Sequence, residues 1–185
     1  MAATVVVSES NGAGQVVTDN LSNINFGSDD APNLSPASSP IIIGDRSYGK
    51  WLRCKLSALG GSSQIDNFKV WKSSGAYVTG EAIRSSIDDT SGGGAGRYLN
   101  VNYQTPATTL LSPSFTLIPP TAPTTPNLGI DNTGTPDDAA NDTVSGALTS
   151  APSYTRYWAM QMTTTGSTPA GAVNQKVFTI QYDET

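Results

Sequence analysis

Histidine, the side chain best suited to proton transfer near neutral pH, is absent from this sequence. The chain therefore cannot build a Ser-His-Asp or Cys-His catalytic group, or a zinc site with histidine ligands. Its single cysteine, Cys54, also rules out zinc sites made of thiolates and any internal disulfide. These counts exclude most hydrolase and metalloenzyme mechanisms. We expect a protein that is not an enzyme and that needs no cofactor.

Carboxylates are the remaining groups that could do chemistry. Asp131, Asp137, Asp138 and Asp142 lie in one polar stretch, and oxygen ligands on a flexible loop suit a hard cation such as calcium. The stretch lacks the carboxylate spacing and terminal Glu of an EF-hand loop, which favours a solvated loop and leaves cation binding open. Hydrolysis of glycosides needs two carboxylates across a cleft. The sequence places no acid within an aromatic-lined strand, so a glycosidase is not expected.

The composition indicates an all-β protein. Of 185 residues, 18 are Gly and 12 are Pro, and only 14% are charged. Such a chain lacks the Ala, Leu, Glu, Lys and Arg that long helices need, whereas 37% hydrophobic residues suffice for a core. We predict one domain over residues 1–185, an antiparallel β-sandwich of jelly-roll type with long Pro/Gly-rich loops. The section 105–150 is the weakest and richest in loops.

The charge pattern limits the partners. The formal net charge is -5, so the basic surface that nucleic acids or anionic lipids require is missing. The sequence shows no secretory signal at Met1 and no apolar run near the ~20 residues that cross a bilayer. We therefore expect a protein made in a reducing cytosol, with neither nucleic acid nor a membrane as its partner.

Alternation of apolar and polar residues predicts two hairpins. The first joins 48–56 to 65–71 and directs Leu52, Cys54 and Leu56 inward; the second joins 154–164 to 173–183. Residues 81–87 are the best place for a short helix or a single turn, and the pattern of 127–150 predicts a long surface loop. Weaker strands are predicted over 3–9, 21–26, 41–43, 76–79, 97–104 and 115–118.

The two hairpins resemble each other in sequence. The segment 48–56 aligns with 154–162 at an offset of 106, and Ile65 aligns with Val173 at an offset of 108. Duplication of one unit would give two Greek keys of a jelly roll. Alternatively, any two amphipathic hairpins share this pattern, and the sequence leaves both interpretations open.

Two groups of residues are expected to form interfaces. Trp51 and Trp71 are predicted on the outward face of the first hairpin, where they are buried by a second layer, form a subunit contact or stack on sugars. The other group is a polyproline-like arm that could add to the sheet edge of a partner. Its prolines are Pro119, Pro120, Pro123 and Pro126.

Several segments resemble structural proteins of tailed bacteriophages. They are Pro40–Ile43, Tyr48–Arg53, Ile65–Trp71 and Phe178–Glu184, which together with their surroundings cover about half the chain. The chain is similar in particular to jelly-roll decoration or cement proteins of capsids. That resemblance implies a virion protein of the capsid surface, made in the host cytoplasm, which binds the major capsid protein and stabilises the shell. It also implies a homotrimer or another small homo-oligomer, and it carries over no functional residues.

Two other functions remain open. The chain could be another virion component, associated with the tail, the neck or a fibre. It could also be a carbohydrate-binding β-sandwich, which would require Trp51 or Trp71 to be exposed in a shallow groove.

Overall fold

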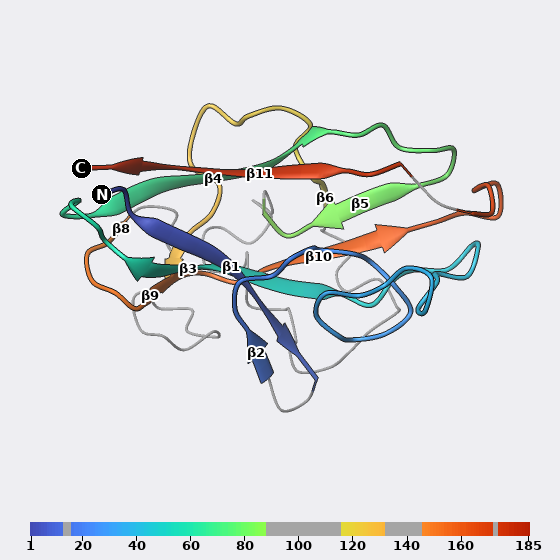
Figure 1. Ribbon diagram of the computed structural model, residues 1–185. Helices are drawn as coiled ribbons and strands as arrows, with labels where there is room; N and C mark the ends of the chain where they lie inside the picture. The colour runs from blue at the N-terminus through green and yellow to red at the C-terminus, as the bar shows by residue number, and fades with distance from the viewer. Residues whose placement is uncertain (13–15, 88–115, 132–145, 172–173) are drawn as a thin grey trace.

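The computed structural model describes residues 1–12, 16–87, 116–131, 146–171 and 174–185 (Figure 1). These residues form β-strands and no helix. The strands are β1 (Thr4–Asn11), β2 (Val16–Thr18), β3 (Lys50–Ala58), β4 (Ile65–Ser74), β5 (Ala82–Ser85), β6 (Thr116–Leu117), β7 (Ile130–Asp131), β8 (Ala147–Leu148), β9 (Ser153–Thr155), β10 (Trp158–Thr163) and β11 (Val177–Glu184).

The strands belong to two antiparallel sheets. Sheet A has the order β2-β1-β3-β10-β5-β6, and β9 pairs with both β3 and β7 beside this path. Sheet B has the order β11-β4-β8. Figure 1 shows β4 and β11 along the top of the molecule and β3 and β10 below them. The predicted all-β, sandwich-like fold is confirmed, whereas the jelly-roll connectivity stays a prediction.

The two predicted hairpins are wrong. The strands β3 and β4 lie in different sheets, and so do β10 and β11. Instead, β3 pairs with β10 in sheet A, and β4 pairs with β11 in sheet B. Each predicted hairpin turn is therefore a crossing from one sheet to the other. The alternation was assigned correctly, but the two strands of each predicted hairpin contribute to the core from different sheets instead of sharing hydrogen bonds.

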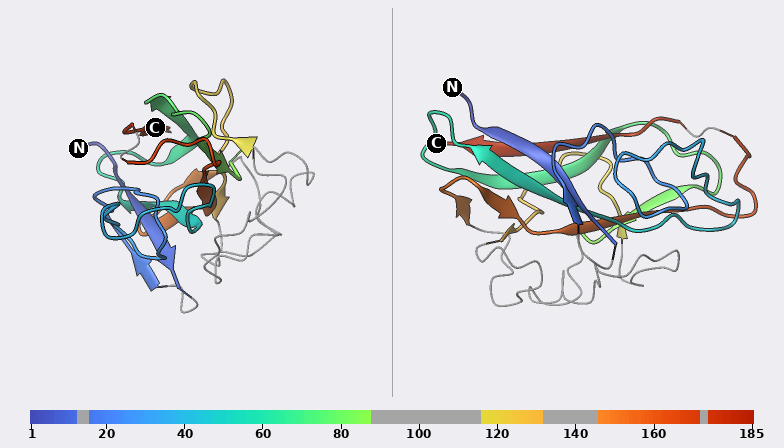
Figure 2. Two further views of the ribbon diagram at one scale, coloured as in Figure 1. Left: turned by 90° about the vertical axis from the view of Figure 1, so that its right-hand side faces the viewer. Right: turned by 60° about the horizontal axis from the view of Figure 1, so that its bottom comes forward.

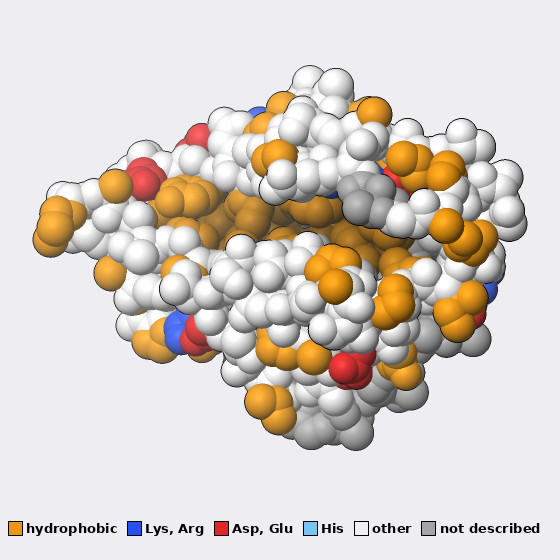
Figure 3. Space-filling model, turned by 45° about the vertical axis from the view of Figure 1, so that its right-hand side comes forward, with side chains coloured by type: hydrophobic (Ala, Val, Ile, Leu, Met, Phe, Trp, Pro, Cys, Tyr) orange, Lys and Arg blue, Asp and Glu red, His pale blue; other side chains and the backbone are white. Residues whose placement is uncertain are grey.

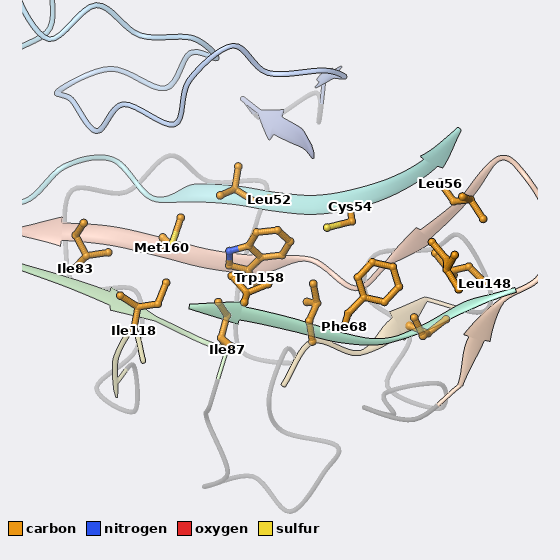
Figure 4. Packing of buried hydrophobic residues seen from close by; sticks show 14 of the residues in the cluster. Leu52, Cys54, Leu56, Phe68, Ile83, Ile87, Ile118, Leu148, Trp158 and Met160 are labelled. Atoms are coloured by element: carbon orange, nitrogen blue, oxygen red, sulfur yellow. The ribbon is translucent and has the colours of Figure 1, made fainter. Parts of the chain in front are cut away.

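One hydrophobic cluster joins the two sheets. Leu52, Cys54 and Leu56 of β3 are fully buried, as predicted, and face Phe68 of β4. Figure 4 shows the Trp158 ring of β10 in the middle of this cluster. Burial of side chains of this size contributes about 1.5–3 kcal/mol each, so the cluster is the main source of stability.

Other local predictions are corrected by the structure. Residues 81–87 contain β5 instead of a helix, because Ile83, Ser85 and Ile87 are buried on alternate positions. The segments 21–26, 41–43 and 76–79 form no strand, and Ile42 is 71% exposed. The predicted strand 97–104 lies outside the described residues, whereas β6 confirms the strand predicted at 115–118 in its described part.

The stretch 127–150 is not only surface loop. Its described part contains β7 and β8, and the side chains of Leu128, Ile130 and Leu148 are buried in the core. The two chain termini lie together at one end of the molecule (Figure 2), where the Ala3 N–H donates to Glu184 Oε2 at 3.1 Å.

Candidate functional site

The molecule is hollowed on one side, between the two sheets. Figure 3 shows that hydrophobic side chains line this hollow, which runs along the length of the face. Its margins are β11 on one side and, on the other, β1 together with the residues that follow β2. We call this surface the open side. The margin strands β1 and β11 carry five hydrophobic residues that are only partly buried and packed against the core cluster, namely Val5, Val7, Phe178, Ile180 and Tyr182.

The register explains why these side chains point into the sandwich. Val5 lies opposite Leu56 and Val7 opposite Cys54, so both valines share the inward face of sheet A. Ile180 lies opposite the buried Val70 in sheet B. The inward faces of β1 and β11 are thus core-facing, yet they are less buried than the equivalent faces of β3 and β4. The core is incompletely covered along this side.

The strand β11 also has an unpaired edge. Within the part of the chain that the structure describes, β11 pairs with β4 and with no other strand. On β4, Val70 and Lys72 direct their backbone groups away from β11, towards Asn127 and Pro119. Because neighbouring residues of a strand alternate, Lys69 and Trp71 must face β11 and pair with Gln181 and Thr179.

The register with β4 determines which backbone N–H and C=O groups of β11 face the free edge. Since Thr179 and Gln181 face β4, the N–H and C=O groups of Phe178, Ile180 and Tyr182 point the other way. Unpaired backbone groups of this kind form a template on which another strand can pair. The open side therefore combines a row of hydrogen-bonding groups with an adjoining apolar hollow.

The opposite edge of sheet B is closed. Asn127 acts as a substitute strand residue: its Oδ1 accepts from the Val70 N–H at 2.8 Å, and its Nδ2 donates to the Val70 C=O at 2.9 Å. The Lys72 N–H donates to the Pro119 C=O at 2.8 Å, and β8 pairs with Ile65 and Asp66. Proline cannot continue such a ladder, so this edge is protected against further strands.

The predicted arm lies along this closed edge. The two ends of the arm are bonded to β4, through Pro119 to Lys72 and through Asn127 to Val70. Pro120, between these ends, is exposed. Pro123 and Pro126 are partly buried. The arm thus supports the protein's own sheet with one side and presents its other side, including Thr121, Ala122, Thr124 and Thr125, to solvent.

The two tryptophans expected at an interface do not share a surface. Trp51 belongs to β3 in sheet A and is only 4% exposed, while Trp71 belongs to β4 in sheet B and is partly buried. Each alternates with inward-facing neighbours, so each points away from the core on its own sheet. The prediction that both lie on the face of one hairpin is wrong, because β3 and β4 are in different sheets.

A buried ion pair lies at the polar end of the interior, between β1 and β3. Lys50 Nζ lies 2.8 Å from Glu9 Oε1, and both side chains are at most 1% exposed. Lys50 also donates to the Ala31 C=O at 2.7 Å, and Asn11 Nδ2 donates to Glu9 Oε1 at 2.8 Å. The second carboxylate oxygen, Oε2, has no hydrogen-bond partner among the described residues. Burial raises the pKa of Glu9 above its ordinary value, against the opposing effect of the Lys50 ammonium.

Sequence reasoning overlooked this pair. The alternation places Lys50 on the same inward face as Leu52 and Cys54, and it places Glu9 in line with Val5 and Val7. The sequence does contain a signal for the pair, because it places one cation and one anion at core-facing positions of two strands. Because a buried charge without a partner costs several kcal/mol, the pair favours the alignment of β1 and β3 in which Glu9 and Lys50 meet.

Other charged groups lie on the outer surface of sheet A. The Arg53 guanidinium stacks on Tyr154, 3.8 Å from the ring centroid, and on Tyr157 at 4.7 Å. Lys55 pairs with Asp19, whose hydrogen bonds from Lys55 and Ser8 lower its pKa. Arg53 alternates with the inward-facing Leu52 and Cys54, and its outward-pointing side chain is covered by the two aromatic rings.

The described residues contain no group of three or more His, Cys, Asp or Glu side chains that could hold a metal ion. Asp137, Asp138 and Asp142 lie outside the described residues, so cation binding there stays a prediction. Where the structure is described, it also has no helix of the length and hydropathy needed to span a bilayer. No protein-family model matches the sequence, and neither the curated proteins nor the solved structures gave a match.

Proposed function

We propose that the protein is a structural component of a phage virion, of the decoration or cement type, and that it works by binding instead of by catalysis. The observation that carries this proposal is the open side, where an unpaired strand edge adjoins an apolar hollow. Surfaces of this kind serve assembly, because they offer both hydrophobic burial and backbone hydrogen bonds to a partner.

The composition supports the same proposal. A chain without histidine has few means of acid–base or nucleophilic catalysis. Its one thiol is unsuited to nucleophilic attack, because complete burial raises the pKa of Cys54 to about 12. The low share of charged residues favours broad contacts made by apolar groups and backbone.

The proline arm is the proposed attachment to the major capsid protein. Its exposed residues Pro120 to Ala122 stand on the closed edge of sheet B, where the hydrogen bonds of Pro119 and Asn127 hold its two ends. A pre-ordered extended segment loses little conformational entropy on binding, which favours tight contact with a shell.

The alternatives differ in what they require. A carbohydrate-binding site would require Trp51 or Trp71 to be exposed in a shallow groove, and it is disfavoured because Trp51 is only 4% exposed and Trp71 is partly buried. A location in the tail, neck or fibre uses the same adhesive surfaces and differs from decoration only in position on the particle.

Position is therefore the decisive measurement. Purified protein is added to particles of the encoding phage that lack it, and its density is located by electron cryomicroscopy. Density over the shell supports decoration, and density confined to the tail or neck supports the alternative. Ala122→Arg on the exposed face of the arm should abolish binding, whereas Ser57→Arg at an exposed position of β3 should not. Equal binding by both variants would contradict attachment through the arm.

A further inference from the structure

We propose that the open side is an interface between two copies of this chain, in which β11 pairs antiparallel with β11 of the second copy. The inference deepens the proposed function by naming the partner on the open side. It leaves the arm free to contact the shell. Pairing about a two-fold axis would join two sheets B into one continuous sheet.

The choice of a second copy rests on the self-complementarity of β11. Asp183 and Glu184 lie at the end of the strand, whereas Lys176 just before it is already paired with Glu81 of the same chain. Antiparallel pairing keeps the acidic ends of the two strands apart and places each beside the uncharged beginning of the other. Parallel pairing would bring the carboxylates of both copies together and is disfavoured.

The backbone selects one register. The groups that face the free edge belong to Phe178, Ile180 and Tyr182, so only these residues can form hydrogen-bonded pairs across the seam. All three are used when Ile180 lies opposite Ile180 of the second copy. Phe178 then faces Tyr182 of the second copy, which forms two aromatic pairs related by the two-fold axis. Cross-strand aromatic pairs contribute favourably to sheet stability.

The same register covers the hollow. A two-fold axis perpendicular to the sheet keeps the inward face of each β11 on the same side of the joined sheet. The apolar side chains of the second strand would then extend the roof of the hollow above Val5 and Val7. Each copy would complete the core of the other along the side that is incompletely covered.

The contrast between the two edges of sheet B supports this assignment. One edge is closed by Asn127 and a proline arm, which prevent further pairing. The other edge has eight residues from Val177 to Glu184, contains no proline and carries no charged side chain from Val177 to Tyr182. A long edge without such protection is suited to pairing with another strand.

Proline at position 180 tests the seam. Ile180→Pro removes an N–H that faces the free edge and leaves the N–H groups that bind β4 in place. We expect the natural chain to sediment at twice the mass of one chain. Ile180→Pro should raise the dissociation constant of the dimer by roughly 100-fold, because it removes two symmetric hydrogen bonds. Ile180→Ala keeps the N–H and should remain a dimer. A natural chain that is monomeric at all concentrations overturns the proposal.

Cysteine cross-linking tests the register without weakening the strand. Thr179 would lie opposite Gln181 of the second copy as a non-hydrogen-bonded pair, with Cα atoms about 4.5 Å apart, within reach of a disulfide. A mixture of Thr179→Cys and Gln181→Cys chains should therefore form a covalent dimer on oxidation. Either variant alone should not, because its two cysteines would be offset by two residues. Cross-linking that is equal in all three samples overturns the register.

The experiments distinguish a failure of the proposed dimer from a failure of the proposed function. A chain that dimerises through β11 but fails to bind particles refutes the proposed function and keeps the dimer. A chain that binds particles as a monomer refutes the dimer and keeps the proposed function. Ile180→Pro protein, once shown by circular dichroism to be folded, provides the monomer for this comparison.

Discussion

Leu52 of β3 lies directly opposite Trp158 of β10. These two residues are also aligned by the internal sequence repeat, which has an offset of 106 there. In sheet B, Trp71 lies opposite Thr179, and this pair has the offset of 108 seen in the second part of the repeat. In each sheet one aligned pair thus lies directly opposite, and the aligned residues on either side of it are displaced in opposite directions along the two strands. Two copies of one strand–turn–strand unit that pack antiparallel would produce this relationship, which favours duplication as the origin of the repeat.

The Leu52–Trp158 pair predicts a large cost for truncating the leucine. Leu52 is fully buried, and Figure 4 shows it beside Trp158 and Met160. Leu52→Ala should lower the free energy of unfolding by about 2–5 kcal/mol, measured by chemical denaturation. Ser57→Ala, at an exposed position of the same strand, is the matched control. A loss below about 1 kcal/mol would mean that the site is not tightly packed.

The pair of Glu9 and Lys50 predicts a specific pH dependence. The pKa of Glu9 is raised in the folded state, so the protonated form favours folding. The stability that Glu9 contributes is fully present below its ordinary pKa of 4.5 and is lost as the pH rises through the raised value. The unfolding free energy of the natural protein relative to Glu9→Gln should therefore fall with rising pH across that window. A difference that stays constant with pH contradicts the prediction.

The same pair predicts non-additive substitutions. Lys50→Met leaves the Glu9 carboxylate buried without its cation and should cost about 3–5 kcal/mol at neutral pH. Combining it with Glu9→Leu removes both charges and should recover most of that loss. A double-mutant cycle by chemical denaturation measures the coupling, and additive losses would show that the two side chains act independently.

The fold class and the inward faces of the main strands could be predicted from the sequence, but the pairing of the strands could not. The alternation around Leu52 and Phe68 has the same period whether two strands share hydrogen bonds or face each other across a core. Only long-range contacts, such as Leu52 with Trp158, decide between a hairpin and a crossing. The sequence has no local signal for that choice.

Short segments were misread for another reason. Ile83 and Ile87 are four residues apart, which fits one face of a helix, but Ser85 between them is buried as well, which fits a strand. Leu128 and Ile130 are buried, but they are only two apolar residues in a polar stretch and therefore show no strand or helix period. The open side was not predictable either, because Phe178 and Ile180 have the same pattern as a fully covered strand.

Asn127 predicts a large effect from a single amide. Its side chain satisfies both backbone groups of the buried Val70, so Asn127→Ala should lower the free energy of unfolding by about 2–4 kcal/mol. Asn127→Asp keeps the acceptor for the Val70 N–H but places an ionised oxygen beside the Val70 C=O. The free energy of unfolding of this variant should increase in acid, where the protonated carboxyl group can donate a hydrogen bond to that C=O. Thr125→Ala, on the exposed part of the arm, should be nearly neutral.

Cys54 should be unreactive in the folded protein. Complete burial raises its pKa to about 12, so a thiol reagent at pH 8 meets neither an accessible sulfur nor a thiolate. We expect no labelling by an aromatic disulfide reagent in native buffer and one labelled thiol per chain in denaturant. Rapid labelling of the native chain would show that β3 opens at Cys54, and the cross-linking experiment would then require a Cys54→Ala background.

Attachment to particles should resist salt. Only 14% of the residues are charged, and the exposed part of the arm, from Pro120 to Thr125, carries no charge. At about 1 M salt, exposed ion pairs are screened over a few ångströms, whereas apolar contacts and backbone hydrogen bonds persist. The fraction of protein that sediments with particles should therefore be the same in dilute buffer and in sodium chloride at that concentration. Release by moderate salt would show that ion pairs hold the protein on the particle, which would exclude the uncharged arm as its main contact.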